Sequence, residues 1–244
     1  MPDAATPSLL YAPDLGASGS VFQLSREEAH YVARVCRARA GDLADATDGR
    51  GAVARLRLVS VGADVRAEVV SIERPERKRG TRLWCGAPER GRADWLVEKL
   101  AELGVASFQP LECEGAPWPA GAARMERWRR LAIAALRQSR RAFLMEIRPP
   151  VSVGEAIQTM EHPAGCWVGD RDGRPAGAAV RPAPFEIGAI GPSGGFRGRE
   201  RERLDAAGFV PIRLADGRLR TETAAVTLAA WWAMPGNGEQ TPGG

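Results

Sequence analysis

The sequence contains very little lysine and histidine. Of its 34 basic residues only Lys78 and Lys99 are lysine, and its two histidines are His30 and His162. Neither histidine stands in a glycine-rich or nucleophile-bearing stretch, so a Ser-His-Asp or Cys-His mechanism is not indicated. Chemistry that needs little acid–base assistance is therefore favoured.

The sequence also lacks metal-binding motifs and long apolar runs. Its four cysteines are scattered, and no Cys-x-x-Cys or Cys/His ligand spacing occurs, which disfavours a zinc site. We expect them to be small core residues in a reducing compartment. No charged segment followed by an apolar one marks a signal peptide, and no run is long enough to span a bilayer. These absences predict a cytoplasmic protein.

Arginine supplies nearly all of the positive charge, and the net charge is +4. The guanidinium group is a planar fork of donors that suits phosphate, although a GC-rich genome, which favours arginine codons, would give the same composition. The positions of the arginines indicate a basic surface, because Glu126 and Glu146 are the only acidic residues between positions 124 and 148. Such a local field attracts nucleic acid; a solvated helix face is the alternative, but such faces usually mix signs.

The first 74 residues predict a small β-barrel. Ser25 to Glu28 forms a capping-box pattern that opens a helix over about 26–37. Short strands are expected over 43–47, 52–59 and 65–72, with Asp48-Gly49 as a hairpin signal between the first two. Several short strands with turn signals are typical of a small barrel. The charged stretch 75–80 predicts a linker.

Residues 81–235 predict an α/β domain with a mostly parallel sheet, because strands and helices alternate. Strands are expected over 82–85, 108–113, 166–169, 186–191 and 210–214. Helices are expected over 93–103, 125–140, 199–207 and 221–234, with a short helix after the capping box Ser152–Glu155. Trp95, Leu96 and Leu100 have core spacing in the first of these helices. We expect the Gly- and Pro-rich tail, 236–244, to be disordered.

Two glycine-bearing loops follow strands in this domain. The first is IGPSGGF, residues 190–196, where glycine lets backbone amides approach a ligand closely; a tight structural turn is the alternative. The second is LADGRLRTETAA, residues 214–225, where Thr221 is expected to cap the last helix. In open α/β sheets ligands bind at the carboxyl ends of strands, so both loops are placed to contact one.

A third polar stretch, RQSRR at residues 137–141, ends the long basic helix. Gln138 and Ser139 can form hydrogen bonds with a base edge while arginines hold phosphates. The alternative is a polar helix end whose cations offset the helix dipole.

Taken together, IGPSGGF, LRTETAA, WLVEKLAELGV and LRQSRR resemble the SPOUT-class methyltransferases. Within that class the chain is similar to the RsmE family, the 16S ribosomal RNA uridine-N3 methyltransferases. HYVARVCRARAGD and ATDGRG resemble the family's opening region, so the likeness covers most of the chain. It implies an N-terminal PUA-like barrel that binds RNA and a C-terminal SPOUT domain tied in a trefoil knot. It also implies a homodimer that binds S-adenosylmethionine and acts on ribosomal RNA or the small subunit.

As a hypothesis for the mechanism, we expect Arg220 to orient the target base or its phosphate and to favour the N3 anion, while Glu222 or Ser139 positions the base. The implied cofactor-binding residues are Val168, Gly169, Ile190, Gly191, Pro192, Gly194, Gly195, Leu214, Leu219, Arg220 and Thr221. The implied RNA-binding residues are Arg34, Arg37, Arg39, Lys99, Gln138, Arg140 and Arg141.

Three departures from the family pattern keep other functions open. Ser193 replaces a glutamate in the glycine loop, Arg137 and Arg140 replace the glutamate and glycine of EQSGR, and residues 115–118 replace an Arg-Ser pair. A non-catalytic RNA-binding or ribosome-assembly factor with the same fold is one alternative. A dinucleotide-dependent oxidoreductase is the other, but no acidic residue follows the loop at ribose-binding distance.

Overall fold

The computed structural model describes residues 9–62, 64–77, 80–119, 121–161, 163–178 and 185–234. His162, Lys78, the end of the expected linker and the tail 236–244 lie outside these ranges. The chain divides into two compact units, residues 1–78 with 132–144 and residues 79–131 with 145–244. The sequence had predicted one boundary near residue 75, whereas residues 132–144 return to the N-terminal unit.

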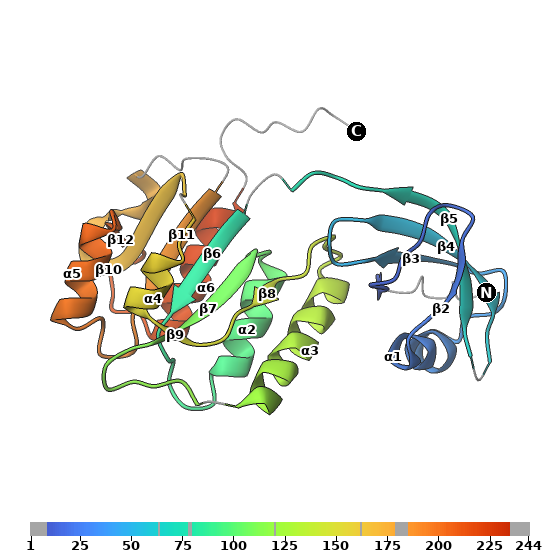
Figure 1. Cartoon of the computed structure of the whole chain (residues 1–244), viewed down its shortest axis with the longest axis horizontal. Coiled ribbons are helices and arrows are strands. Elements are labelled where there is room, and N and C mark those ends of the chain that lie inside the picture. The colour runs from blue at the N-terminus through green and yellow to red at the C-terminus, as the bar shows by residue number, and fades with distance from the viewer. Residues whose placement is uncertain are drawn as a thin grey trace. The chain divides into compact units, whose positions relative to one another are not determined.

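The N-terminal unit contains a five-stranded sheet in the order β1-β3-β4-β5-β2 (Figure 1). The predicted strands 43–47, 52–59 and 65–72 are confirmed within one residue, whereas the two shortest strands, β1 and β2, were not foreseen. β1 pairs parallel with β3, and the other pairs are antiparallel. The strands are β1 Leu10–Tyr11, β2 Val21–Gln23, β3 Leu43–Thr47, β4 Val53–Ser60 and β5 Arg66–Glu73.

The predicted first helix forms in two parts, α1 (Arg26–His30) and a π-helical turn (Tyr31–Val35). Ser25 caps it as expected, because its hydroxyl accepts the backbone N–H of Glu28 at 3.2 Å. The Glu28 side chain accepts a hydrogen bond from Arg137 instead of completing the capping box. The helix ends by Arg37, whose φ of 52° is left-handed.

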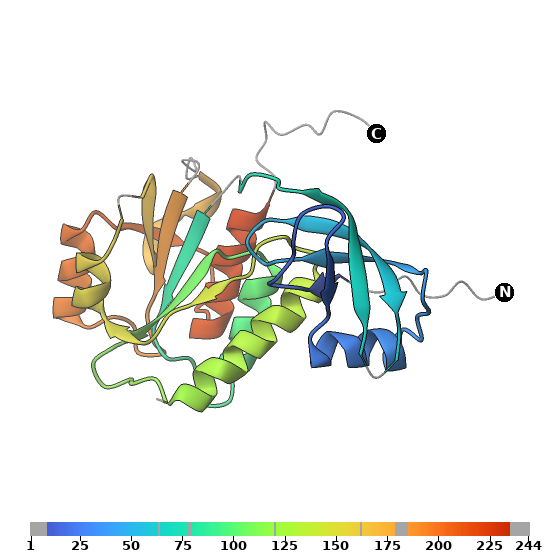
Figure 2. The ribbon, with the colours of Figure 1, turned by 45° about the vertical axis from the view of Figure 1, so that its right-hand side comes forward.

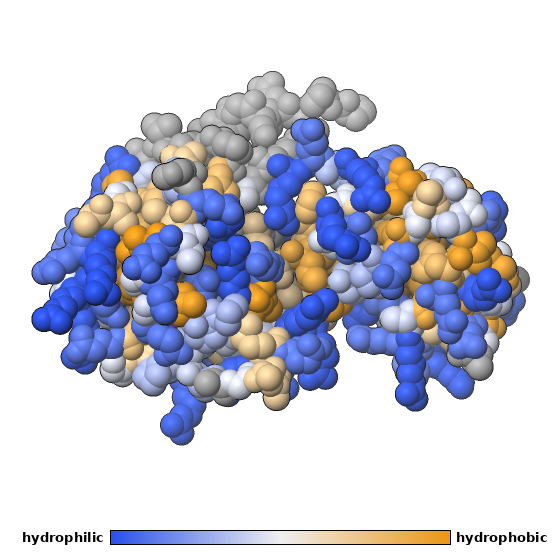
Figure 3. All heavy atoms as spheres, in the orientation of Figure 1, coloured by the Kyte–Doolittle hydropathy of each residue, from blue (hydrophilic) through white to orange (hydrophobic). Residues whose placement is uncertain are grey.

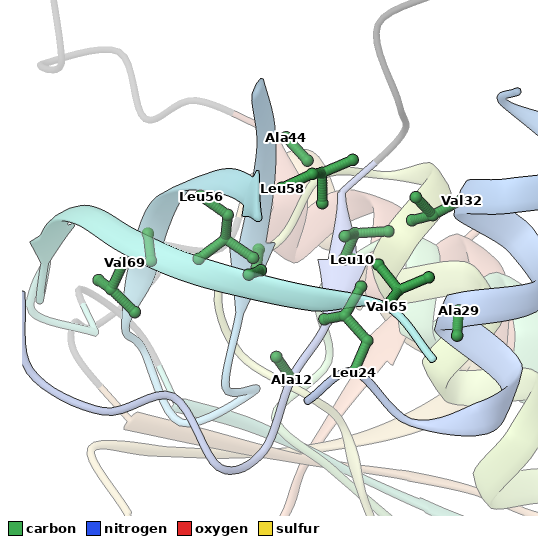
Figure 4. Packing of buried hydrophobic residues seen from close by; sticks show 13 residues of the cluster. Leu10, Ala12, Leu24, Ala29, Val32, Ala44, Leu56, Leu58, Val65 and Val69 are labelled. Atoms are coloured by element: carbon green, nitrogen blue, oxygen red, sulfur yellow. The ribbon is translucent and has the colours of Figure 1, made fainter. Parts of the chain in front are cut away.

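Aliphatic side chains from the sheet and α1 form the core of this unit (Figure 4). Leu56 and Leu58 of β4, Val69 of β5 and Val32 of the π-helical turn are within it, and each is completely buried or nearly so. The turn after β3 is longer than a two-residue hairpin, since Asp48 accepts hydrogen bonds from the backbone N–H groups of Arg50 and Ala52.

Residues 132–144 join this unit through backbone and side-chain hydrogen bonds. The carbonyl of Ala142 accepts the Thr47 hydroxyl at 3.0 Å and the Gly51 N–H at 3.0 Å. The Leu144 N–H donates to the carbonyl of Gly49. These contacts link segments about a hundred residues apart, so no local sequence signal marks them.

The C-terminal unit contains a sheet in the order β12-β10-β11-β6-β7-β8, with β9 also paired to β7. Every pairing in it is parallel, as the alternation of strands and helices predicted. β8 and β9 have two residues each and were not predicted. The strands are β6 Gly80–Cys85, β7 Ser107–Glu112, β8 Glu146–Ile147, β9 Val151–Ser152, β10 Gly165–Pro175, β11 Phe185–Ile190 and β12 Val210–Arg213.

Helices cover both faces of this sheet (Figure 2). α4 and α5 pack on one face over Trp84, Ile187 and Ala189, whereas α2 and α6 pack against each other on the opposite face. Gly188 of β11 permits close packing there, because a Cβ would lie 2.4 Å from the Leu228 side chain of α6. The helices are α2 Ala93–Glu102, α3 Ala122–Gln138, α4 Val153–Gln158, α5 Gly198–Ala206 and α6 Thr221–Ala233.

Two predicted details of the helices change. Trp95 was expected in the core of α2, but it is 41% exposed. The buried face of the helix does not include it and consists of Leu96, Val97, Leu100 and Ala101. The helix expected over 125–140 begins at Ala122 and ends at Gln138.

All four cysteines are free; Cys85 and Cys113 are buried, and Cys36 and Cys166 are partly buried. Among the described residues no group of histidine, cysteine and carboxylate side chains could hold a metal ion, and no helix is long and apolar enough to cross a membrane. On the face drawn in Figure 3, hydrophobic side chains are interspersed among hydrophilic ones.

Candidate functional site

A cleft of about 650 Å³ lies at the carboxyl ends of β11 and β12 and beside the middle of β10, which continues to Pro175 rather than ending near residue 169 as the sequence predicted. This volume is within the range of small-molecule sites, and the strand ends are where parallel sheets bind ligands. Three chain segments form most of its wall: the middle of β10, the glycine loop after β11 and the loop between β12 and α6. The lining residues are Glu89, Gly169, Asp170, Arg171, Ile190–Phe196, Arg201, Arg213, Leu214, Ala215, Gly217–Thr221 and Ala224.

The glycine loop turns sharply at residues 192–195, where the Gly195 N–H donates to the Pro192 carbonyl at 2.7 Å. Gly195 has a φ of 78°, which favours glycine. Gly86, at the end of β6, packs directly behind the loop, since a Cβ there would lie 2.5 Å from the Pro192 nitrogen. By contrast, a Cβ at Gly194 or Gly195 would meet nothing within 4 Å. The loop is therefore packed on one side and open on the other.

The second loop is tied to the first by two hydrogen bonds. The Thr221 hydroxyl donates to the Gly191 carbonyl at 3.1 Å, and the Arg218 guanidinium donates to the Ser193 carbonyl at 3.1 Å. Thr221 had been expected to cap α6, but Arg220 occupies the N-cap and Thr221 is the first helical residue. The Thr221 hydroxyl is thus used to join the two loops.

Charged residues around the cleft are mostly arginine, and two of them pair with carboxylates. Arg201 of α5 donates to Asp170 and lies 2.9 Å from Asp205. The hydrogen bond from Arg201 holds the pKa of Asp170 below its ordinary value. Arg220 donates through Nη1 to Glu89 Oε2 at 2.7 Å. The carboxylates of Asp170 and Glu89 are thus engaged by arginines at the cleft.

Glu222 is buried in the first turn of α6 rather than exposed in the cleft. Its side chain is 5% exposed, and Oε1 lies 4.0 Å from Nε of Arg92. Oε2 is buried without a hydrogen-bond partner among the described residues. The charge of Glu222 and burial both contribute to the raised pKa of the Cys85 thiol, with burial the larger cause.

Most of the predicted cofactor residues come together in this cleft. Of the eleven named from the sequence, Val168 alone is not in its lining, because it is fully buried within β10. The other ten line one continuous wall.

The remaining predicted site residues lie elsewhere. Ser139 is not in the cleft lining, and its hydroxyl donates to the Ala135 carbonyl within α3. Lys99 is held 2.8 Å from both Glu98 and Glu102, and the hydrogen bond that it donates to Glu102 is the main reason that its pKa is raised. Its charge is therefore largely offset by its neighbours on α2.

The arginines at the end of α3 are also less available than the sequence suggested. Arg140 donates to Asp45 at 2.7 Å, and Arg137, the family's glutamate position, donates to Glu28 at 2.7 Å. Arg141 is half-buried, and burial lowers its pKa. Of this group Gln138 is exposed, as are Arg34, Arg37 and Arg39 after α1.

Several cleft residues were missed by sequence reasoning. Glu89 and Arg171 carry no recognisable motif, and only the fold brings Glu89 to the cleft. Arg218 and Ala215 lie inside LADGRLRTETAA and could have been chosen from that motif. Asp170 was expected at this wall, next to Val168 and Gly169, but it lies within β10 and not after it.

Comparison with known proteins gives a consistent family. A family model described as the RNA methyltransferase domain matches residues 75–233, and one described as the RNA methyltransferase PUA domain matches residues 24–70. The chain is similar to ribosomal RNA small subunit methyltransferase E of Synechocystis sp., with 29% identity, covering 91% of this chain and 75% of that protein. The Bacillus subtilis protein of the same name is 27% identical, covering 83% and 86%.

A solved structure agrees with this. The crystal structure of ribosomal RNA small subunit methyltransferase E from Neisseria gonorrhoeae, bound to S-adenosylmethionine, superposes with a TM-score of 0.83 and 25% identity. The likeness covers 92% of this chain and 95% of that one. These matches support an α/β domain preceded by a PUA domain and lend no support to the oxidoreductase alternative.

Proposed function

Because the chain belongs to the RNA methyltransferase family, as the match over residues 75–233 shows, we propose that it methylates N3 of a uridine in 16S ribosomal RNA. The methyl donor is S-adenosylmethionine, which the Neisseria gonorrhoeae relative binds. The observation that carries the proposal is the cleft itself, in which two glycine-bearing loops joined by the Thr221–Gly191 hydrogen bond meet at the strand ends.

The residues of the cleft suit S-adenosylmethionine. Gly194 and Gly195 leave open space where side chains would otherwise project, so a ligand can lie against their backbone. Ile190, Leu214 and Leu219 supply apolar surface for an adenine ring. The volume of about 650 Å³ is ample for a nucleoside with an amino-acid arm.

S-adenosylmethionine supplies an activated methyl group when bound, so the protein's main contributions are orientation and electrostatics. Arg220, at the N-cap of α6 beside the cleft, orients the target base or its phosphate, and its positive charge favours the uridine N3 anion. Thr221 fixes the position of Arg220 relative to the glycine loop. Glu222, which the sequence suggested as a base-positioning residue, is buried next to Arg92 and acts on the base only through its neighbours at the start of α6. None of these tasks needs histidine.

The proposal includes the assembly and partners expected of the family. The exposed residues Arg34, Arg37 and Arg39 of the N-terminal unit contact ribosomal RNA, as does Gln138. A homodimer is supported by α6, in which Glu222 is the only charged residue, and by the exposed Trp95 and Met234 near it in the α2–α6 layer. A trefoil knot in the C-terminal unit and a cytoplasmic location complete the proposal.

Replacement of Arg220 by alanine tests this function. We expect the variant to bind S-adenosylmethionine with an affinity within about threefold of wild type in calorimetry, because the backbone walls of the cleft remain. Methyl transfer to unmethylated 16S ribosomal RNA, followed by nucleoside mass spectrometry, should fall roughly 100- to 1,000-fold, the loss typical of an electrostatic catalytic group. Arg220→Lys, which keeps the charge, is the matched control and should lose less.

The same measurements distinguish the proposed enzyme from the non-catalytic alternative. A wild-type chain that binds 16S ribosomal RNA but neither binds the cofactor nor transfers a methyl group would be an RNA-binding or assembly factor. Normal turnover by Arg220→Ala would instead remove Arg220 from the mechanism while leaving the enzyme class intact. Methylation of the uridine at a position other than N3 would overturn only the proposed product and not the enzyme class.

A further inference from the structure

Two ion pairs of opposite polarity join the loop before α2 to the start of α6. Glu89 of the loop lies 2.7 Å from Arg220, and Arg92 of the same loop lies 4.0 Å from Glu222. The partners are more than a hundred residues apart in sequence, so the fold alone brings them together. The loop therefore contacts both residues to which the proposed function gives a role at the start of α6.

The two pairs differ in the burial of their carboxylates. Glu222 is buried and its partner Arg92 is 55% exposed, whereas Glu89 and Arg220 are 47% and 60% exposed. An exposed pair contributes little net stability, because solvent and salt screen it. Glu89 also engages Arg220 through Nη1, and among the described residues the other donors of the guanidinium fork have no hydrogen-bond acceptor. The Glu89–Arg220 pair can therefore be exchanged for another anion.

A phosphate group is the anion best suited to make this exchange. It carries oxygens that match the planar fork of arginine in a two-point contact, which is stronger than a single hydrogen bond to a carboxylate. Approach of a phosphate to Arg220 also brings it towards Glu89, and like charges repel. A substrate phosphate therefore replaces Glu89 only if its contact with Arg220 is stronger than that of the carboxylate.

We propose that Glu89 is a substrate-specificity residue, whose carboxylate holds Arg220 in the RNA-free cleft and is displaced by an RNA phosphate. This inference rests on the proposed function, in which Arg220 faces the target nucleotide. Glu89 weakens RNA binding and confines it to segments that present a phosphate at Arg220. It takes no part in the methyl transfer that follows, because the RNA has by then replaced it.

The Glu89→Gln variant tests this directly. Its KM for 16S ribosomal RNA transcribed in vitro should fall roughly three- to tenfold, with no parallel fall in kcat. RNA affinity should also become more salt-dependent, with the slope of log Kd against log salt steeper by up to ~0.7, as for one additional neutralised phosphate. Glu161→Gln is the control, because it removes an exposed carboxylate that pairs at 2.6 Å with the largely buried Arg82, near the start of β6 and away from the cleft. It should leave KM, kcat and slope unchanged.

A double variant separates an effect through Arg220 from a general effect of charge. In an Arg220→Ala background, Glu89→Gln should change RNA affinity less than twofold, because the interaction has already been removed. The same gain in both backgrounds would overturn the proposal. So would a tenfold fall in kcat at constant KM, which would make Glu89 a positioning residue, or no change in either constant.

The binding measurements also keep this inference distinct from the proposed function. If the wild-type chain transfers no methyl group to RNA, the proposed function fails, yet RNA affinity and its salt slope still report whether Glu89 competes at Arg220. If the wild type methylates RNA normally and Glu89→Gln binds RNA with wild-type affinity and slope, the present inference alone fails.

Discussion

Arg137 in the N-terminal unit and Arg220 in the C-terminal unit each donate to a glutamate at 2.7 Å, but in different surroundings. Arg137 and Glu28 are 19% and 3% exposed, whereas Arg220 and Glu89 are 60% and 47% exposed. Desolvation makes a buried charge depend on its partner, while an exposed one can be satisfied by water. Two similar distances therefore indicate two different uses of arginine.

This difference separates arginines that hold the fold from those that meet a ligand. Arg137 joins the end of α3 to α1, and Arg140 joins it to Asp45 of β3. Both lie in the stretch that the sequence suggested as an RNA surface, yet each pairs with a carboxylate of its own unit, Arg137 with the buried Glu28 and the more exposed Arg140 with Asp45. The less committed arginines at the cleft are better placed for RNA.

The largest effect that would test this comparison is on folding stability. Arg137→Ala leaves Glu28 buried without its arginine, and we expect the free energy of unfolding to fall by about 2 to 4 kcal/mol. Arg220→Ala should lower it by less than about 1 kcal/mol. Urea unfolding followed by circular dichroism measures both, with Arg137→Lys as a charge-keeping control that loses less than alanine. Equal losses of unfolding free energy in the two alanine variants would contradict the distinction between a structural Arg137 and an available Arg220.

A smaller effect is expected in the pH dependence of stability. Burial raises the pKa of Glu28 above its ordinary value and outweighs the lowering by Arg137. The folded state therefore binds this proton more tightly than the unfolded state. As pH rises from the ordinary pKa to the raised one, the contribution of Glu28 to the free energy of unfolding decreases.

Urea unfolding of the wild type and Glu28→Gln between about pH 4 and 7 measures this contribution. The glutamine variant has no such proton, so its stability relative to wild type should improve as pH rises through that interval. A constant difference between the two proteins would mean that the pKa of Glu28 is not raised.

The smallest effect concerns the backbone at Arg140. Its φ of 53° is left-handed, where a side chain costs roughly 1 kcal/mol relative to glycine. Arg140→Ala loses the exposed pair with Asp45 and keeps the strain, whereas Arg140→Gly relieves it. The glycine variant should therefore be more stable than the alanine variant by about 1 kcal/mol in the same unfolding assay. An alanine variant as stable as the glycine variant would show that the strain is absent.

Local patterns predicted the elements and the cofactor loops well. The strands 43–47 and 186–191, the helix from Thr221 and both glycine loops follow from alternation, caps and turns, which act over a few residues. The family resemblance assigned the cofactor wall, and ten of its eleven residues line one cleft. Strands of two residues such as β1 and β8 were missed, because so short a segment has no periodicity of its own.

The sequence by itself determined which segments become strands, helices and glycine turns, and thus where a ligand could meet the backbone. The tertiary structure alone decided which charges are available. Glu89 and Arg220 are 131 residues apart, and Glu28 and Arg137 are 109 apart. Charged residues follow no periodic pattern in the sequence, and each one pairs with a group that the fold brings close to it. Only the folded chain therefore distinguishes a buried arginine from one beside the cleft.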